Sequence, residues 1–197
     1  VENLPPQQTS YTFTNNINNS AKTDNWLSKS AAADTENDTL SATVKTDGTK
    51  GSFTINSNEI TYTPNASQTG SDTGVITISD GNGGEVDVTV TVNGIDTVSP
   101  VITVNNPNTD PALSKTVTAS VDDGTLTMKE LAAVTDACDG NTSYIAYADK
   151  TFNNSADNGK AMCYRAEDAV GNVSYSKSNA ISGIDTEAPT GTLTNNG

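Results

Sequence analysis

The chain has no histidine among its 197 residues, and lysine and arginine together number only 10. Without histidine, a catalytic triad that depends on an imidazole base cannot form, and zinc loses its commonest nitrogen ligand. Two cysteines are too few for a four-thiolate metal site. The 24 acidic residues give a formal net charge of −14. Such a surface is unsuited to nucleic acid or to anionic membranes, so we expect neither as a partner.

Aromatic residues are also few: 1 Trp, 6 Tyr and 3 Phe are spread along the chain. Two carboxylates can hydrolyse a glycosidic bond, but that chemistry needs a sugar cleft, which aromatic side chains commonly line. We therefore expect no enzyme, and we expect Trp26 in a core rather than under a sugar ring.

Large apolar residues are scarce, since Val, Ile, Leu and Phe together number 35. None of them forms a run near the 18 residues that a membrane helix needs, so we expect no membrane insertion. So few apolar residues with high net charge would ordinarily indicate disorder. Here, however, they occur in short alternating runs. That arrangement predicts an all-β chain of thin domains, with bound cations as a possible aid.

The clearest alternating run is EVDVTVTV at 85–92, which places Val86, Val88, Val90 and Val92 on one face of a strand. The preceding residues 74–79 alternate as well, and DGNGG at 80–84 supplies the Asp-Gly and Asn-Gly signals of a hairpin. Residues 51–55 and 59–63 flank another turn. The pattern is that of a β-sandwich.

One phrase occurs twice: residues 94–100 read GIDTVSP and residues 183–189 read GIDTEAP. The copies lie 89 residues apart, about the length of an Ig-like domain, so we interpret them as domain junctions. We expect domains over 1–95 and 96–185. Residues 186–197 are expected to begin a following repeat or linker, as in a piece of a tandem array.

The second domain contains candidate strands at 101–104, 116–121, 143–147 and 161–166, and a hairpin turn around Gly171 and Asn172. TMKE at 127–130 fits a capping box ahead of LAAV at 131–134. The segment leaves two alternatives open, one short helix or a strand.

Cys138 and Cys163 are the only cysteines. The chain is poor in bases and rich in Thr, Ser and Asn, which fits an exported protein, and in an oxidising compartment the pair would form a disulfide. The alternative is two buried free thiols.

The stretch ADTENDTL at 33–40 holds Asp34, Glu36 and Asp38 at alternate positions with no base between them. In an extended segment these side chains point to one side and repel each other. Calcium, which takes six to eight hard oxygen ligands, would offset that repulsion. The alternative is a solvated acidic loop.

The first domain resembles the cadherin-like repeats of very large bacterial surface proteins. The resemblance is carried by the segments NLPP (3–6), DTENDTL (34–40), GSFTI (51–55), YTPN (62–65), GSD (70–72) and SDGNGG (79–84). The second domain resembles bacterial Ig-like repeats in DNGKAMC (157–163), AEDAVGN (166–172) and the closing GIDTEAP. Such repeats occur in tandem in large surface adhesins, including the RTX type.

The cadherin-like pattern implies that Asp72 and Asp80 join the three acids as calcium ligands. Asp80 has a competing reading as a simple turn residue. Asp96 and Asp185, at the two junctions, could bridge adjacent domains through calcium, or could be ordinary linker aspartates that cap turns.

The resemblance implies an extracellular, calcium-stabilised extender or adhesion region on a bacterial cell surface, spacing a binding tip from the cell. We expect a monomer whose partners are neighbouring repeats of the same chain and a host or biofilm surface ligand. Two alternatives remain open: a module that itself binds a glycan or peptide, and an accessory domain of a secreted enzyme.

Overall fold

A computed structural model describes residues 2–8, 10–13, 17–188 and 190–191. Its contacts divide the chain into two compact units, one formed by residues 1–98 with 170–172 and the other by residues 99–169 with 173–197. Each unit is built from two β-sheets, so the chain has the Ig-like β-sandwich fold that the alternating runs predicted. Most of the segment expected to begin a following repeat, at 189 and 192–197, lies outside the described residues.

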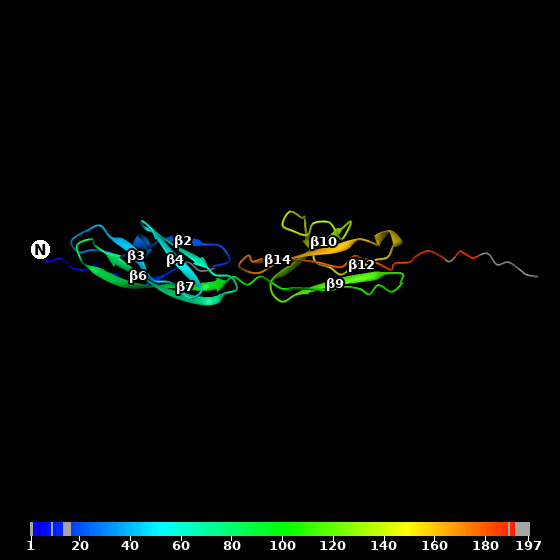
Figure 1. Cartoon of the computed structure of the whole chain (residues 1–197), viewed down its shortest axis with the longest axis horizontal. Helices are drawn as coiled ribbons and strands as arrows, with labels where there is room; N and C mark the ends of the chain where they lie inside the picture. Colours follow the sequence, from blue (N-terminus) through cyan, green and yellow to red (C-terminus); the bar gives the residue numbers. More distant parts are fainter. Residues whose placement is uncertain (1, 9, 14–16, 189, 192–197) are drawn as a thin grey trace, which may run out of the picture. The chain divides into compact units, whose positions relative to one another are not determined.

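In the first unit, a four-stranded sheet has the order β1-β7-β6-β3 and a three-stranded sheet has the order β2-β5-β4 (Figure 1). The strands are β1 (Tyr11–Thr12), β2 (Lys22–Asn25), β3 (Ser41–Thr46), β4 (Gly51–Asn56), β5 (Glu59–Pro64), β6 (Thr69–Ser79) and β7 (Glu85–Asp96). The expected hairpin joins β6 to β7, with Ser79 opposite Glu85.

The alternation in β7 is confirmed. Val88, Val90 and Val92 are at most 3% exposed, and Val86 packs against the same core. Trp26 is fully buried there, as expected, and its indole N–H donates to the carbonyl of Ser57. This core fills the space between the two sheets.

A short helix in the first unit, α1 (Trp26–Ser30), was not predicted. Asn25 caps it, because its Oδ1 accepts the backbone N–H of Ser28 at 2.8 Å. The described residues include no helix with the length and apolar character needed to cross a membrane.

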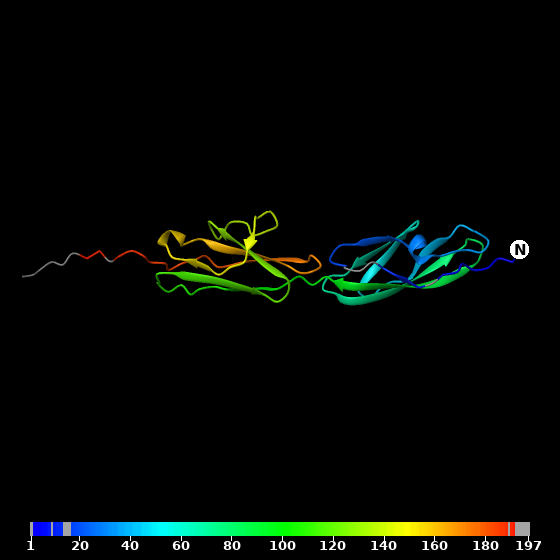
Figure 2. The ribbon, with the colours of Figure 1, turned by 180° about the vertical axis from the view of Figure 1, so that it is seen from behind.

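The second unit has a four-stranded sheet of order β11-β10-β13-β14 and a three-stranded sheet of order β12-β9-β8, both seen from behind in Figure 2. Its elements are β8 (Ile102–Asn105), β9 (Lys115–Val121), β10 (Thr125–Leu131), β11 (Ile145–Ala146), β12 (Lys150–Phe152), the 3-10 helix η1 (Ser155–Asp157), β13 (Ala161–Glu167) and β14 (Val173–Lys177).

Of the two alternatives for the segment that begins at Thr127, the structure has the strand, because residues 125–131 form β10, which pairs along its whole length with β13. Leu126 and Met128 alternate toward the main core, so tertiary packing overrides the local capping signal.

The disulfide is confirmed. Cys138 and Cys163 are joined, with their Cα atoms 5.5 Å apart. The bond ties the loop after β10 to β13, and a small apolar cluster around Leu131 and Ala161 packs beside it.

The first three residues of the repeated phrase, at 94–96 and 183–185, make the same backbone contacts in both units. Ile95 and Ile184 are buried, and each lies in a parallel bridge, with Ile17 and Ala112 respectively. In the first unit Ile17 donates to the Gly94 carbonyl and accepts from the N–H of Asp96. In the second unit Ala112 makes the matching bonds to the Gly183 carbonyl and the Asp185 N–H. The two units therefore share one pattern of backbone hydrogen bonds at this motif.

A candidate metal centre in the first unit

Three carboxylates of the first unit converge. Oxygen atoms of Asp34, Asp38 and Asp80 all lie within 4.8 Å of one another. Asp34 and Asp38 come from the loop ahead of β3, and Asp80 begins the loop between β6 and β7. Because β3 pairs with β6, with Ser41 opposite Ser79, the two loops meet at the same end of one sheet.

The loop at 34–38 brings its acids together by curling, not by the extended alternation we expected. Oδ1 of Asp34 accepts the backbone N–H groups of Glu36 at 2.9 Å and of Asp38 at 3.0 Å. Asn37 adopts the left-handed conformation, with φ of 63°. The chain thus wraps around the Asp34 carboxylate, and Glu36 does not belong to the group of three.

Asp80 is held firmly in its loop. It is only 4% exposed, and its Oδ1 accepts the backbone N–H groups of Asn82 at 2.7 Å and Gly84 at 2.9 Å. Its Oδ2 accepts the side-chain amide of Asn3 at 3.0 Å. Burial alone raises the pKa of Asp80, but these three hydrogen bonds outweigh it and hold the pKa below its ordinary value. The carboxylate is therefore ionised at neutral pH.

Gly84 is required at this point for a steric reason. A Cβ at this position would lie 2.1 Å from Oδ2 of Asp80 and 2.8 Å from Cα of Pro5. The glycine lets the segment NLPP approach the loop closely. Both readings of DGNGG therefore describe the same loop, with glycine shaping the turn and Asp80 facing the other acids.

Two carboxylate oxygens of the loop at 34–38 lack hydrogen-bond partners among the described residues. They are Oδ2 of Asp34 and Oε2 of Glu36, and both atoms are buried. An ionised oxygen that is buried without a donor is costly. A divalent cation would satisfy the Asp34 oxygen together with the facing carboxylates, so the donor set fits a hard cation such as calcium.

Asp72 does not join the cluster, which corrects our expectation of its place. Asp72 and Ser79 both belong to the single strand β6, and at about 3.3 Å per residue they are roughly 23 Å apart. The Asp72 carboxylate instead accepts five hydrogen bonds, from Thr49 N and Oγ1, Lys50 N, Tyr62 Oη and Thr73 N. Its structural role is to hold the loop between β3 and β4.

Asp96 and Asp185 form turns, each in its own unit. Oδ1 of Asp96 accepts the N–H of Val98, and Oδ1 of Asp185 accepts the N–H of Glu187, both at 3.1 Å. This is the turn-capping arrangement that we weighed for linker aspartates. A calcium ion at either carboxylate stays a prediction.

A hollow of about 500 Å³ lies beside the acid cluster. Asp34 and Asp38 line it together with Leu27, Ala32, Ala33, Asn37, Thr39, Leu40 and Asn58. The hollow leaves the cluster open to solvent on one side, so water could complete the coordination of an ion held there.

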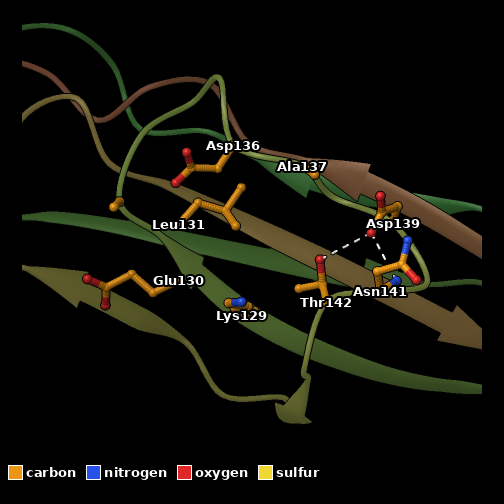
Figure 3. A pocket seen from close by; sticks show the side chains of 9 residues that line it. Lys129, Glu130, Leu131, Asp136, Ala137, Asp139, Asn141 and Thr142 are labelled. Atoms are coloured by element: carbon orange, nitrogen blue, oxygen red, sulfur yellow. Dashed lines mark hydrogen bonds between the residues drawn. The ribbon is translucent and has the colours of Figure 1, made fainter.

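The second unit has a comparable hollow of about 470 Å³, formed by β10 and the disulfide-tied loop that follows it (Figure 3). The acidic residues that line this hollow already make hydrogen bonds or ion pairs with neighbouring residues. Asp139 accepts from the Asn141 N–H and the Thr142 hydroxyl, and Glu130 pairs with Lys150 and Lys160. Among the described residues, the one group of three acidic side chains close enough together to hold a metal ion is in the first unit.

Sequence reasoning missed two residues of the candidate centre. Asn3 donates to Asp80, and the side-chain amide of Asn82 donates to Oδ2 of Asp38 at 2.8 Å. Both lie in segments that we singled out, NLPP and DGNGG, but nothing in the sequence indicated that their amides would face carboxylates.

One comparison with known proteins identifies a kind of domain in the first unit. Residues 3–93 match the family described as "Bacterial Ig domain". The match covers the unit that we had likened to cadherin-like repeats, so it supports a bacterial Ig-like repeat, a class typical of extracellular surface proteins. No curated protein matches the chain.

Solved structures resemble the chain only distantly. An endo-fucoidan hydrolase from glycoside hydrolase family 107 aligns at 14% identity and a TM-score of 0.40, over 88% of this chain and 28% of that one. The human desmocollin-1 ectodomain aligns at 13% identity and a TM-score of 0.34, over 90% of this chain and 41% of that one. The chain thus spans less than half of either protein.

Proposed function

We propose that this chain is a calcium-stabilised extender region of a large, RTX-type bacterial cell-surface adhesin, spacing a binding tip from the cell. The observation that carries the proposal is the repeated closing motif. Both units end on GIDT with the same buried isoleucine, the same parallel bridge and the same pair of backbone hydrogen bonds. A module closed twice in one way is suited to serial repetition, which a spacer needs and a binding tip does not.

A spacer of this kind needs no catalytic group, and we propose that this region is not an enzyme. Its partners are then neighbouring repeats, with a host or biofilm surface ligand engaged by the tip. The complete reading frame tests this role. We expect further copies of the unit, with GIDT recurring about every 89 residues. A single copy beside a catalytic domain would favour an accessory module of a secreted enzyme.

Calcium is proposed at Asp34, Asp38 and Asp80. Support comes from three carboxylates within 4.8 Å and from the buried, unpartnered Oδ2 of Asp34. Extracellular calcium modules commonly have dissociation constants of about 10⁻⁴ to 10⁻³ M. At free calcium about 100 times the dissociation constant, binding stabilises the folded state by about 2.7 kcal/mol. For a thin-cored domain this is a large share of the total stability.

Trp26 allows a test confined to the first unit, because it is the only tryptophan and lies fully buried in that core. We expect chelation of calcium to lower the melting temperature that its fluorescence reports. Magnesium should restore the temperature poorly, because it dehydrates reluctantly and demands octahedral geometry. An unchanged melting temperature in calcium and in chelator would mean that the acids form a solvated loop.

The variant that isolates the cluster is Asp34→Asn with Asp38→Asn. The asparagine at position 34 retains an oxygen for the N–H groups of residues 36 and 38 but removes the charge. We expect this double variant to ignore calcium and to be at least as stable as the natural chain in chelator, since like-charge repulsion is relieved. Its matched control, Glu59→Gln with Glu85→Gln, removes two exposed charges outside the cluster and should keep the full calcium response.

A further inference from the structure

The peptide bond between Asn82 and Gly83 is accessible to solvent. It lies in the loop between β6 and β7, and both residues are open to solvent. The backbone N–H of Gly83 has no hydrogen-bond acceptor among the described residues, whereas those of Asn82 and Gly84 both donate to Asp80. Nothing lies within 4 Å of the place where a Cβ of Gly83 would be. The nitrogen of Gly83 is therefore unhindered, and the Asn82 side chain is held only through its Nδ2, which donates to Asp38, while its carbonyl oxygen accepts no hydrogen bond among the described residues.

The two other Asn-Gly pairs in the described residues are restrained. Asn158 has its amide held on both sides, since Nδ2 donates to the Ile184 carbonyl and Oδ1 accepts the Ile184 N–H. The N–H of Gly159 donates to the Ile181 carbonyl at 2.8 Å. Asn93 and Gly94 lie at a bulge of β7 where neither pairs with β6, but the flanking residues Val92 and Ile95 do, and the Gly94 carbonyl accepts the N–H of Ile17.

We propose that Asn82 is a site of spontaneous deamidation. The nitrogen of Gly83 attacks the side-chain carbonyl carbon of Asn82, the C–N bond of the amide breaks, and ammonia leaves with the proton of the Gly83 N–H. One water molecule then opens the five-membered succinimide ring. The product is an aspartyl or isoaspartyl residue, and no oxidant, reductant or cofactor takes part.

The position of Asn82 gives the reaction a consequence for the candidate metal centre. Its amide donates to Oδ2 of Asp38 at 2.8 Å. Deamidation replaces this donor with a carboxylate beside the three that already converge. Without a cation the new charge repels Asp38, and with a cation it offers a further hard oxygen ligand. This consequence rests on the proposed calcium site, whereas the deamidation itself does not.

Peptide mass mapping tests the reaction. The chain is incubated in mildly alkaline buffer, and a glutamyl endopeptidase that cuts after Glu85 separates Asn82 from Asn93. We expect the peptide containing Asn82 to gain about one dalton, because an NH group is replaced by oxygen. The peptides containing Asn93 and Asn158 should keep their mass. An unchanged Asn82 peptide, or equal gains at Asn158, overturns the proposal.

Calcium titration followed by Trp26 fluorescence tests the consequence. We expect Asn82→Asp to bind calcium about tenfold more tightly, because added ligand charge strengthens such sites. In chelator this variant should melt at a lower temperature than the natural chain. Asn82→Gln, which keeps the amide, should bind as the natural chain does. Equal affinities of Asn82→Asp and Asn82→Gln overturn the consequence. If no form binds calcium, the proposed metal site fails, while the mass gain still decides the deamidation.

Discussion

The hydroxyl of Tyr62 donates a 2.8 Å hydrogen bond to Oδ2 of Asp72 in the interior of the first unit. The same carboxylate accepts four further hydrogen bonds, from Thr49, Lys50 and Thr73. Burial raises the pKa of Asp72, but these hydrogen bonds outweigh it and lower the pKa below the ordinary value. Burial and the facing charge of Asp72 raise the pKa of Tyr62.

Asp72→Asn should therefore destabilise the first unit by about 2–3 kcal/mol, because donors that now face a charge would meet an amide. Since the folded-state pKa is depressed, the natural chain has this stability above the unfolded pKa of about 3.9 and loses it as the pH falls through the folded value. Acid titration of Trp26 fluorescence should show a shallower loss in the variant. Equal acid sensitivity in both would contradict the assignment, and Asp87→Asn, at an exposed pair with Lys45, serves as the control.

Reduction of the Cys138–Cys163 disulfide should destabilise the second unit alone. The bond closes a loop with a sequence separation of 25. In the chain-entropy model such a loop contributes about 3 kcal/mol. Calorimetry with reductant should show one transition shifted downward, while the Trp26 transition stays in place. A shift of the Trp26 transition would show that the two units do not unfold independently.

Lys115→Met should destabilise the second unit by about 1–3 kcal/mol, by leaving buried acceptors unpaired. The Lys115 side chain is 4% exposed, and its Nζ donates to the carbonyls of Asn108 and Asp110 and to Oδ1 of Asn108. Lys129→Met is the matched control, because Lys129 has no ion pair among the described residues. Chemical denaturation compares the two variants, and equal losses would mean that the buried hydrogen bonds of Lys115 contribute nothing.

Asp96→Asn should leave stability in chelator unchanged, because an asparagine oxygen accepts the same Val98 N–H. Asp96→Ala removes that acceptor and should cost about 1 kcal/mol. Thermal melts in chelator compare the two variants, and equal stability of Asn and Ala would show that the turn contributes nothing. Melts in calcium address the junction ion separately, since an ion at Asp96 would make the Asn variant lose part of its calcium response.

The strands with strict alternation were predictable because the side-chain period of a strand is unambiguous. Val88, Val90 and Val92 show this in β7. The structure of the segment after Thr125 was not predictable, since its apolar residues fit both a helical and a strand spacing over so short a length. Only the pairing of β10 with β13 decides it. The helix α1 was missed because one turn carries too little periodicity to detect.

The candidate centre was partly predictable for a similar reason. Asp34, Asp38 and Asp80 stand in loops, where resemblance and charge pointed to a shared role, and the pairing of β3 with β6 brings those loops together. Asp72 was misplaced because its position depends on how far β6 extends, and the sequence marks the ends of a strand poorly. The amides of Asn3 and Asn82 depend on side-chain directions that no sequence pattern contains.

The parallel bridges at the two closing motifs also have a mechanical meaning. In each unit an early segment runs parallel to the last one, Ile17 beside Ile95 and Ala112 beside Ile184. When tension draws the ends of a unit apart, parallel neighbours slide past each other, so their hydrogen bonds are loaded in shear and must break together. Antiparallel neighbours pulled from one end would instead unzip bond by bond. The GIDT motif therefore stands where each unit resists being pulled open.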